Sequence, residues 1–129
     1  MTNGEIGAIR GRRAPSLGQA VALLTLICLQ PAHALSIREM RALEQSDKKH
    51  GPNYVQYYLV GAMEGALEAN SQSVRSGAKA LFCLNGRRLE PRMAKPLLEA
   101  ELRRNAGVYE ADMPVQLVLF NALVASYTC

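Results

Sequence analysis

The chain has 129 residues, which is room for one domain, and its hydrophobic fraction of 49% allows that domain a core. Its formal net charge is +4, from 15 basic and 11 acidic residues. Three of the basic residues stand in the first 16 positions, and residues 35–129 carry a net charge of only +2. So small an excess gives no reason to expect nucleic-acid binding.

The first 34 residues contain the three parts of an export signal in the usual order. Arg10, Arg12 and Arg13 form a basic start, and the uncharged apolar run 20–29 follows. This run suits the apolar segment of a signal peptide and is too short to span a bilayer. Ala32-His33-Ala34 then provides a cleavage site of the A-x-A type. We predict a signal peptide over residues 1–34, cleavage after Ala34, and an exported domain over residues 35–129 without stable membrane insertion.

Two rival interpretations of this end are weaker. An uncleaved membrane anchor would need a longer apolar run. A lipoprotein signal would need a small residue before Cys28, where the chain has Ile27. We therefore treat Cys28 as an ordinary residue of the apolar run.

Two helices are expected next. Ser36 and Glu39 fit a capping box, and Ile37, Met40 and Leu43 would form the apolar side of the first helix. A polar connection over residues 46–52 should end it. Residues 53–70 predict the longest helix of the chain. Its apolar stripe follows helical spacing: Val55, Leu59, Ala62, Ala66 and Ala69.

Two features of this long helix admit functional interpretations. Gly61 and Gly65 are spaced four residues apart, which predicts the close approach of another helix. Tyr54, Tyr57 and Tyr58 cluster at its start. In a chain without Trp these rings are expected to fill the core, and the alternative is an aromatic patch that faces a partner.

The segment after the long helix reads as irregular. Residues 71–77 are expected to form a loop, residues 80–84 a short apolar turn, and Asn85-Gly86 a tight turn. Residues 91–104 then predict a helix with Ala94, Leu97, Leu98 and Leu102 inward, closed by residues 105–107. Pro96 either lies in the first turn of this helix or bends it. Glu99 and Arg103 are spaced for a surface ion pair.

The last helix is expected to be the buried centre of the fold. Asp112 suits its N-cap, and Pro114 its first turn. Apolar residues then lie nearly all round it, which is typical of a helix covered on all sides. A strand over residues 115–120 is the alternative, but no partner strand is expected. The elements together predict an all-α, single-domain helical bundle.

Cys83 and Cys129 are the two cysteines beyond the predicted signal peptide. An even number in an exported chain favours one disulfide, and the apolar neighbours of Cys83 predict buried sulfurs. One alternative is a nucleophilic Cys83 with His50 as its base, which would need an exposed thiolate. A metal site made of His50, Cys83 and Cys129 lacks the ligand number and spacing of known motifs. We expect no catalytic residue, metal or cofactor.

The most basic tract of residues 35–129 consists of Arg87, Arg88, Arg92 and Lys95. Such a tract is most often a solvated surface. The functional alternative is that Arg87, Arg88 and Arg92 bind an acidic protein partner and speed its association.

A series of motifs over residues 54–129 resembles one known family. Tyr57-x-x-x-Gly61 precedes Gly65-Ala66, and Leu81-Phe82-Cys83-Leu84 follows. An amphipathic helix comes next, and a terminal apolar helix then ends in an aromatic residue, one further residue and Cys129. This order resembles the Rap/Tai family, the periplasmic immunity proteins against amidase effectors of type VI secretion.

The resemblance implies an all-helical domain, often a homodimer, which binds a peptidoglycan amidase and occludes its active-site cleft without being an enzyme. It also implies that Cys83 and Cys129 form a structural disulfide. Asn85 departs from the pattern, since proline commonly follows Phe-Cys-Leu in that family. The alternative function is a periplasmic helical binding or envelope-associated domain of the same fold without a toxin partner.

Overall fold

The computed structural model describes residues 34–129, and in this range the chain folds into four α-helices and one 3-10 turn. They are α2 (Ile37–Ser46), α3 (Gly51–Arg75), η1 (Pro91–Met93), α4 (Ala94–Arg104) and α5 (Val115–Ser126). The predicted all-α fold is therefore confirmed. The predicted signal peptide, apart from its last residue, and Cys28 lie outside the described residues. No helix within residues 34–129 is both long and apolar enough to cross a membrane.

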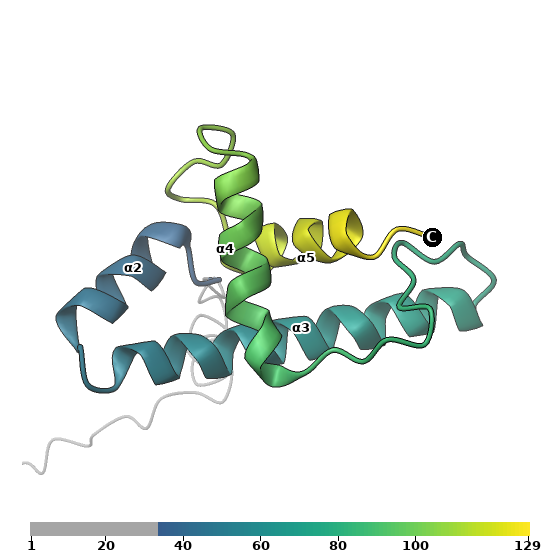
Figure 1. Cartoon of the computed structure of the whole chain (residues 1–129), viewed down its shortest axis with the longest axis horizontal. Coiled ribbons are helices and arrows are strands. Elements are labelled where there is room, and N and C mark those ends of the chain that lie inside the picture. The colour runs from purple at the N-terminus through teal and green to yellow at the C-terminus, as the bar shows by residue number, and fades with distance from the viewer. Residues whose placement is uncertain (1–33) are drawn as a thin grey trace, which may run out of the picture. The chain divides into compact units, whose positions relative to one another are not determined.

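The long helix α3 is the base on which the other helices pack (Figure 1). Helix α2 folds back beside the first half of α3, and α4 crosses over the middle of α3. Helix α5 lies along the second half of α3 and also contacts α4. The chain between α3 and η1 returns from the far end of α3 to the start of α4.

The core lies where α3, α4 and α5 meet, and α5 contributes most to it. Five of its twelve residues are buried: Val115, Val118, Leu119, Ala122 and Leu123. Helix α5 is thus the buried central helix that the sequence predicts, although Leu117 is 47% exposed on its outer side. The strand alternative for residues 115–120 is wrong.

The start of α2 is tied to the start of α5. The predicted capping box is present, since the Glu39 amide donates to the Ser36 hydroxyl and Glu39 accepts from the Ser36 amide. The Ile37 amide also donates to the Met113 carbonyl, at 3.0 Å. Ser36 pairs with Pro114 in an isolated antiparallel bridge. These bonds hold the two helix starts side by side.

The predicted N-cap of α5 is wrong. Pro114, not Asp112, occupies the N-cap position, with φ of −63° and ψ of 129°. The ring of proline fixes φ near this value, and Pro114 needs no amide partner at the point where the chain enters the helix. Asp112 instead pairs with Arg38 at 2.8 Å, an exposed contact between the chain before α5 and α2.

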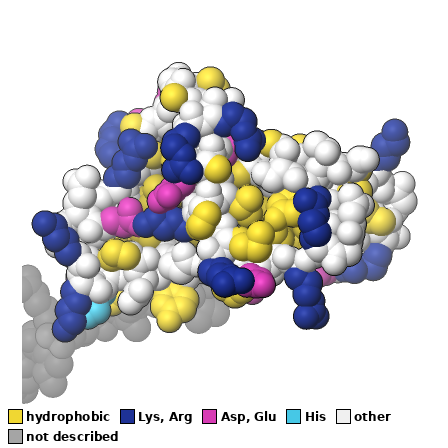
Figure 2. All heavy atoms as spheres, in the orientation of Figure 1, with side chains coloured by type: hydrophobic (Ala, Val, Ile, Leu, Met, Phe, Trp, Pro, Cys, Tyr) yellow, Lys and Arg dark blue, Asp and Glu magenta, His cyan; other side chains and the backbone are white. Residues whose placement is uncertain are grey.

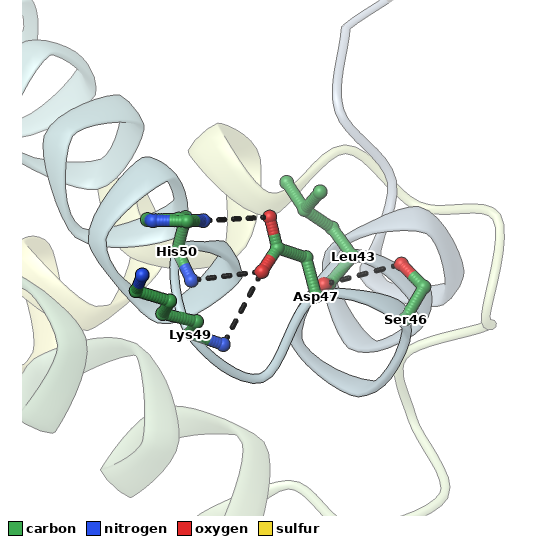
Figure 3. A network of polar contacts seen from close by, with 5 residues as sticks. All are labelled: Leu43, Ser46, Asp47, Lys49 and His50. Atoms are coloured by element: carbon green, nitrogen blue, oxygen red, sulfur yellow. Dashed lines mark hydrogen bonds and ion pairs between the residues drawn. The ribbon is translucent and has the colours of Figure 1, made fainter.

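A single carboxylate shapes the turn between α2 and α3 (Figure 3). Asp47 accepts from the backbone amides of Lys49 and His50, at 3.2 and 2.9 Å, and its second oxygen lies 3.3 Å from His50 Nδ1. This tight turn lets α3 begin at Gly51, two residues earlier than predicted. A Cβ at Gly51 would lie 2.3 Å from the Leu43 carbonyl oxygen, so the two helices meet here backbone to backbone.

Helix α3 also ends later than predicted. Residues 71–75, which were expected in a loop, continue the helix to Arg75, and Gly77 with φ of 90° follows its end. Glu68 accepts from the side chains of Gln72 and Arg75 and so supports this last part. Each serine in this part lowers the stability of the helix by only tenths of a kcal/mol relative to alanine. The side-chain contacts of Glu68 are of similar size and can offset this loss.

The glycine prediction for α3 is wrong. Both Gly61 and Gly65 are exposed, and a Cβ built on either meets no atom within 4 Å. Of the predicted apolar stripe, Val55 and Leu59 are fully buried, with Met63 four residues further on, and Ala62 and Ala66 are partly buried. Ala69, which was expected in the stripe, is exposed. Within residues 34–129 no other helix approaches the glycines, because the packed side of α3 lies about a quarter turn or more away from them.

Replacing Gly61 or Gly65 by alanine should stabilise the protein. Alanine removes backbone freedom from the unfolded chain and adds no clash, so each change should raise the free energy of unfolding by about 1 kcal/mol. Urea unfolding of the mature domain measures this. Gly51→Ala is the matched control and should destabilise, because its Cβ would collide with the Leu43 carbonyl. Equal losses of stability at all three positions would contradict the assignment of an open face to Gly61 and Gly65.

The question left open by Pro96 is answered by the start of α4. The helix begins at Ala94 after the 3-10 turn, so Pro96 is its third residue and lies in the first turn. A proline there removes no intrahelical hydrogen bond, because the first amides of a helix have no partner within it. The predicted inward residues Ala94 and Leu98 are fully buried, and Leu97 and Leu102 are partly buried.

Candidate functional site

The predicted disulfide is present and closes the C-terminal end of the molecule. Cys83 and Cys129 are joined by an S–S bond of 2.12 Å, with Cα atoms 4.8 Å apart and a sequence separation of 46. The Cys83 amide also donates to the Tyr127 carbonyl, at 2.7 Å. In Figure 1 the C-terminus lies beside the segment that follows α3. The last helix is thereby tied back to the middle of the chain.

The residue before the disulfide anchors it in the core. Phe82 is 1% exposed and meets Phe120 of α5 edge to face, with ring centroids 6.2 Å apart. Asn70 of α3 reaches the same segment, since its side chain donates to the Phe82 carbonyl and accepts from the Leu81 amide. The prediction of buried sulfurs is wrong, however, because Cys83 is only partly buried and Cys129 is exposed.

The structure does not bring Cys83 together with His50. The sulfur of Cys83 is bonded to Cys129, and an oxidised sulfur has no thiolate to act as a nucleophile. His50 lies in the α2–α3 turn, where its ring contacts Asp47 (Figure 3). Its ring centroid also lies 6.4 Å from that of Tyr54. Within residues 34–129 no group of three or more His, Cys, Asp and Glu side chains is placed to hold a metal ion.

The Asn85-Gly86 turn directly follows the disulfide. Both residues have positive φ, 52° and 79°, and the Arg87 amide donates to the Leu84 carbonyl across the turn. A proline could not adopt the φ of Asn85, since its ring fixes φ near −65°. The proline that commonly stands at this position in the Rap/Tai pattern could therefore not adopt the conformation of this turn.

The four cations of the basic tract have different environments. The Arg87 guanidinium lies 4.6 Å from the centre of the Tyr127 ring, and Arg88 is exposed. Arg92 pairs with Glu90 at 2.6 Å, and its side chain is 82% exposed. Lys95 contacts Glu44 of α2, so it joins two helices instead of extending the surface. Arg88 and Arg92 are thus the cations of the tract most open to a partner.

The tyrosine cluster is on the surface, so the prediction that these rings fill the core is wrong. Tyr57 is 76% exposed and Tyr54 is 57% exposed. Tyr58 is 36% exposed, donates to Gln116 of α5 and accepts from the Leu35 amide. Phe82 and Phe120 provide the aromatic packing of the core instead. The alternative, a patch facing a partner, stays a prediction.

One buried carboxylate belongs to no motif that the sequence singled out. Glu101 of α4 is 3% exposed, and its oxygens accept from three side chains: Arg104 at 2.9 Å, Asn105 at 2.6 Å and Tyr109 at 2.8 Å. Asn121 of α5 in turn donates to the Tyr109 hydroxyl. The network joins α4, α5 and the chain between them. The spacing in the sequence could have indicated this burial, because Glu101 lies on the same side of α4 as the buried residues Ala94 and Leu98.

This network raises the pKa of Tyr109 above its ordinary value of 10.0. Burial is the largest cause, and the hydrogen bond and the charge of Glu101 act in the same direction. The hydrogen bond from Asn121 and the charge of Arg104 oppose the shift. The phenol of Tyr109 therefore stays protonated to higher pH in the folded protein than in the unfolded chain.

Comparison of the chain with protein-family models, with curated proteins and with solved structures finds no match. The class of protein is therefore defined by the structure alone. It is a small all-α domain in which one disulfide links the chain after the last helix to the middle of the sequence.

Removing the disulfide should cost the domain much of its stability. Loop-closure entropy for a bridge of this span gives up to about 4 kcal/mol, against a usual total of about 5–15 kcal/mol. The double variant Cys83→Ser/Cys129→Ser should show this loss in chemical denaturation. Reductant should lower the unfolding midpoint of the wild type and leave that of the variant unchanged. An unchanged wild-type midpoint would mean that the bridge contributes nothing.

Stability should fall at alkaline pH partly through Tyr109. Because the folded state holds the phenolic proton more tightly, this contribution is complete below pH 10 and is lost as pH rises through the folded-state pKa. Unfolding free energies from about pH 9 to about pH 12 should therefore decline less steeply in Tyr109→Phe than in the wild type. Tyr57→Phe, at an exposed site, is the control and should follow the wild type. Identical slopes for all three proteins would contradict the assignment.

Proposed function

We propose that the protein is a periplasmic immunity protein that binds a peptidoglycan amidase effector of type VI secretion and occludes its active-site cleft. The observation that carries the proposal is the Cys83–Cys129 disulfide. The same two cysteines are the most specific part of the resemblance to the Rap/Tai family. Their bond, inside an all-α fold, agrees with what that resemblance implies.

The environment of the cysteines supports a binding role over a catalytic one. The bond to Cys129 leaves Cys83 no thiolate, and His50 contacts Asp47 instead of a candidate nucleophile. A disulfide also suits an oxidising compartment such as the periplasm, where the predicted signal peptide would deliver the chain.

The exposed surface offers what a protein inhibitor needs. Tyr54 and Tyr57 present aromatic rings to solvent, and tyrosine and arginine are enriched at the centres of protein interfaces. Arg88 and Arg92 add positive charge that would speed the approach of an acidic partner. Occlusion requires an exposed contact surface of this kind and no chemistry of its own.

Co-expression with periplasmic peptidoglycan amidases tests the proposal. Growth should be restored for at least one amidase, and the two proteins should copurify as a complex. A variant lacking residues 1–34 would stay in the cytoplasm and should give no protection against the same amidase. If no amidase is neutralised or bound, the immunity function is wrong, and a helical envelope-binding domain without a toxin partner becomes the better interpretation.

Charge reversal at Arg88 should slow association with the amidase. Arg88→Glu should lower the association rate several-fold at low salt and flatten its salt dependence, because steering acts before contact. Arg87 is left intact, since it lies on the Tyr127 ring and its loss would disturb the fold. Lys48→Glu, in the α2–α3 turn, is the charge-matched control. Equal association rates for both variants and the wild type would exclude steering by Arg88.

A further inference from the structure

The outer side of η1 and α4 carries an apolar groove of about 370 Å³. Its lining consists of Arg92, Met93, Pro96, Leu97 and Ala100. Apart from Arg92, every one of these side chains is apolar. Figure 2 shows hydrophobic side chains gathered on this face of the molecule, with Lys and Arg side chains around them.

Helical spacing explains why these residues share one side of the helix, where Met93 and Leu97 are partly buried against the core and Pro96 is exposed. Positions 93, 96, 97 and 100 follow the spacing of three and four residues that places side chains on one side of a helix. Positions 94, 98 and 101 lie on another side of α4, and all three are buried in the fold. The Gln56 side chain donates to the Pro91 carbonyl and ties η1 to α3. The groove is thus a fixed feature of packed helices.

The net positive charge of the predicted mature chain lies in the segment that contains this groove. Residues 87–104 contain six basic and three acidic residues, a net charge of +3. The rest of the predicted mature chain, residues 35–86 and 105–129, contains six basic and seven acidic residues, a net charge of −1. The whole positive excess of residues 35–129 therefore lies in the segment that carries the groove.

Arginines stand at both ends of the apolar stripe. Arg92 lies at its start, and Arg103 and Arg104 follow Ala100 by three and four residues, at its other end. The side chains of Arg92 and Arg103 are 82% and 72% exposed and pair with Glu90 and Glu99. Exposed pairs of this kind contribute little to stability, so carboxylates of a partner can compete for these arginines.

From this arrangement we propose that the α4 groove is the surface that binds the amidase, and that the amidase fills it with an apolar segment flanked by carboxylates. The inference rests on the proposed function and names the part of the surface that performs it. The two arginine ends are about 16 Å apart, from the helical rise of 1.5 Å per residue. An amidase segment that fits the groove would have apolar side chains at its centre. Its acidic side chains would lie on either side, separated by about the distance between the two arginine ends.

The test is the affinity of the amidase, once identified by co-expression, for groove variants of the exported domain. Ala100→Glu places a carboxylate in the apolar lining and keeps a good helix former, and it should weaken binding by about tenfold or more. Arg92→Glu/Arg103→Glu should weaken binding as well and reduce its salt dependence. Val74→Glu is the control, since Val74 is a half-exposed apolar residue of α3 that does not line the groove. Denaturation curves establish that every variant is folded.

The outcomes separate this inference from the proposed function. Loss of affinity in the groove variants, with Val74→Glu like the wild type, supports the groove. If the wild type neutralises an amidase, and Ala100→Glu binds that amidase with the same affinity as the wild type, the groove is not the binding surface. The immunity function then still stands. A wild type that binds no amidase removes both. If sedimentation shows a wild-type dimer that Ala100→Glu makes monomeric, without effect on the amidase, the groove joins two copies of this chain and the proposal is wrong.

Discussion

The buried helix α5 is anchored at both ends by chain that is distant in sequence, and the rest of the fold depends on this constraint. At its start the Val115 amide donates to the Leu35 carbonyl, which ties α5 to the chain that leads into α2. At its end the Cys83–Cys129 disulfide ties α5 to the segment that follows α3. Because α5 contributes five buried residues to the core, fixing both ends restricts how α3 and α4 can pack on it.

Polar side chains set the positions of the remaining segments. Asp47 shapes the turn between α2 and α3, and Asn70 holds the chain around Phe82 against α3. Glu101 collects three donors and joins α4 to the chain before α5. No buried side-chain nitrogen or oxygen in the described part of the chain lacks a hydrogen-bond partner. Such satisfied networks favour one arrangement of the helices over its competitors.

A division between interior and surface follows from these contacts. The disulfide and the polar networks maintain the fold, and none of them needs a partner protein. The exposed tyrosines and Arg88 contribute little to the core, and the α4 groove stays open for binding although Met93 and Leu97 also pack against the core. In the proposed immunity protein the cysteines would therefore identify the family, and the outer side of α4 would determine which amidase is bound.

The sequence by itself determined the features that depend on neighbouring residues. The capping box at Ser36, the turn at Asn85-Gly86 and the end of α4 near Asn105 depend on local hydrogen bonds and φ values, so short patterns predicted them. The disulfide was predictable because only two cysteines follow the predicted signal peptide.

Only the tertiary structure decided which sides of the helices are covered. Tyr57 was expected to pack because of its aromatic ring, and Gly61 and Gly65 because of their spacing, yet no element within residues 34–129 covers their side of α3. A glutamate is rarely buried by its type, yet Glu101 is buried because three side chains donate hydrogen bonds to it. Burial is a property of the partner element as much as of the residue, and the sequence of one helix does not say which partner lies against it.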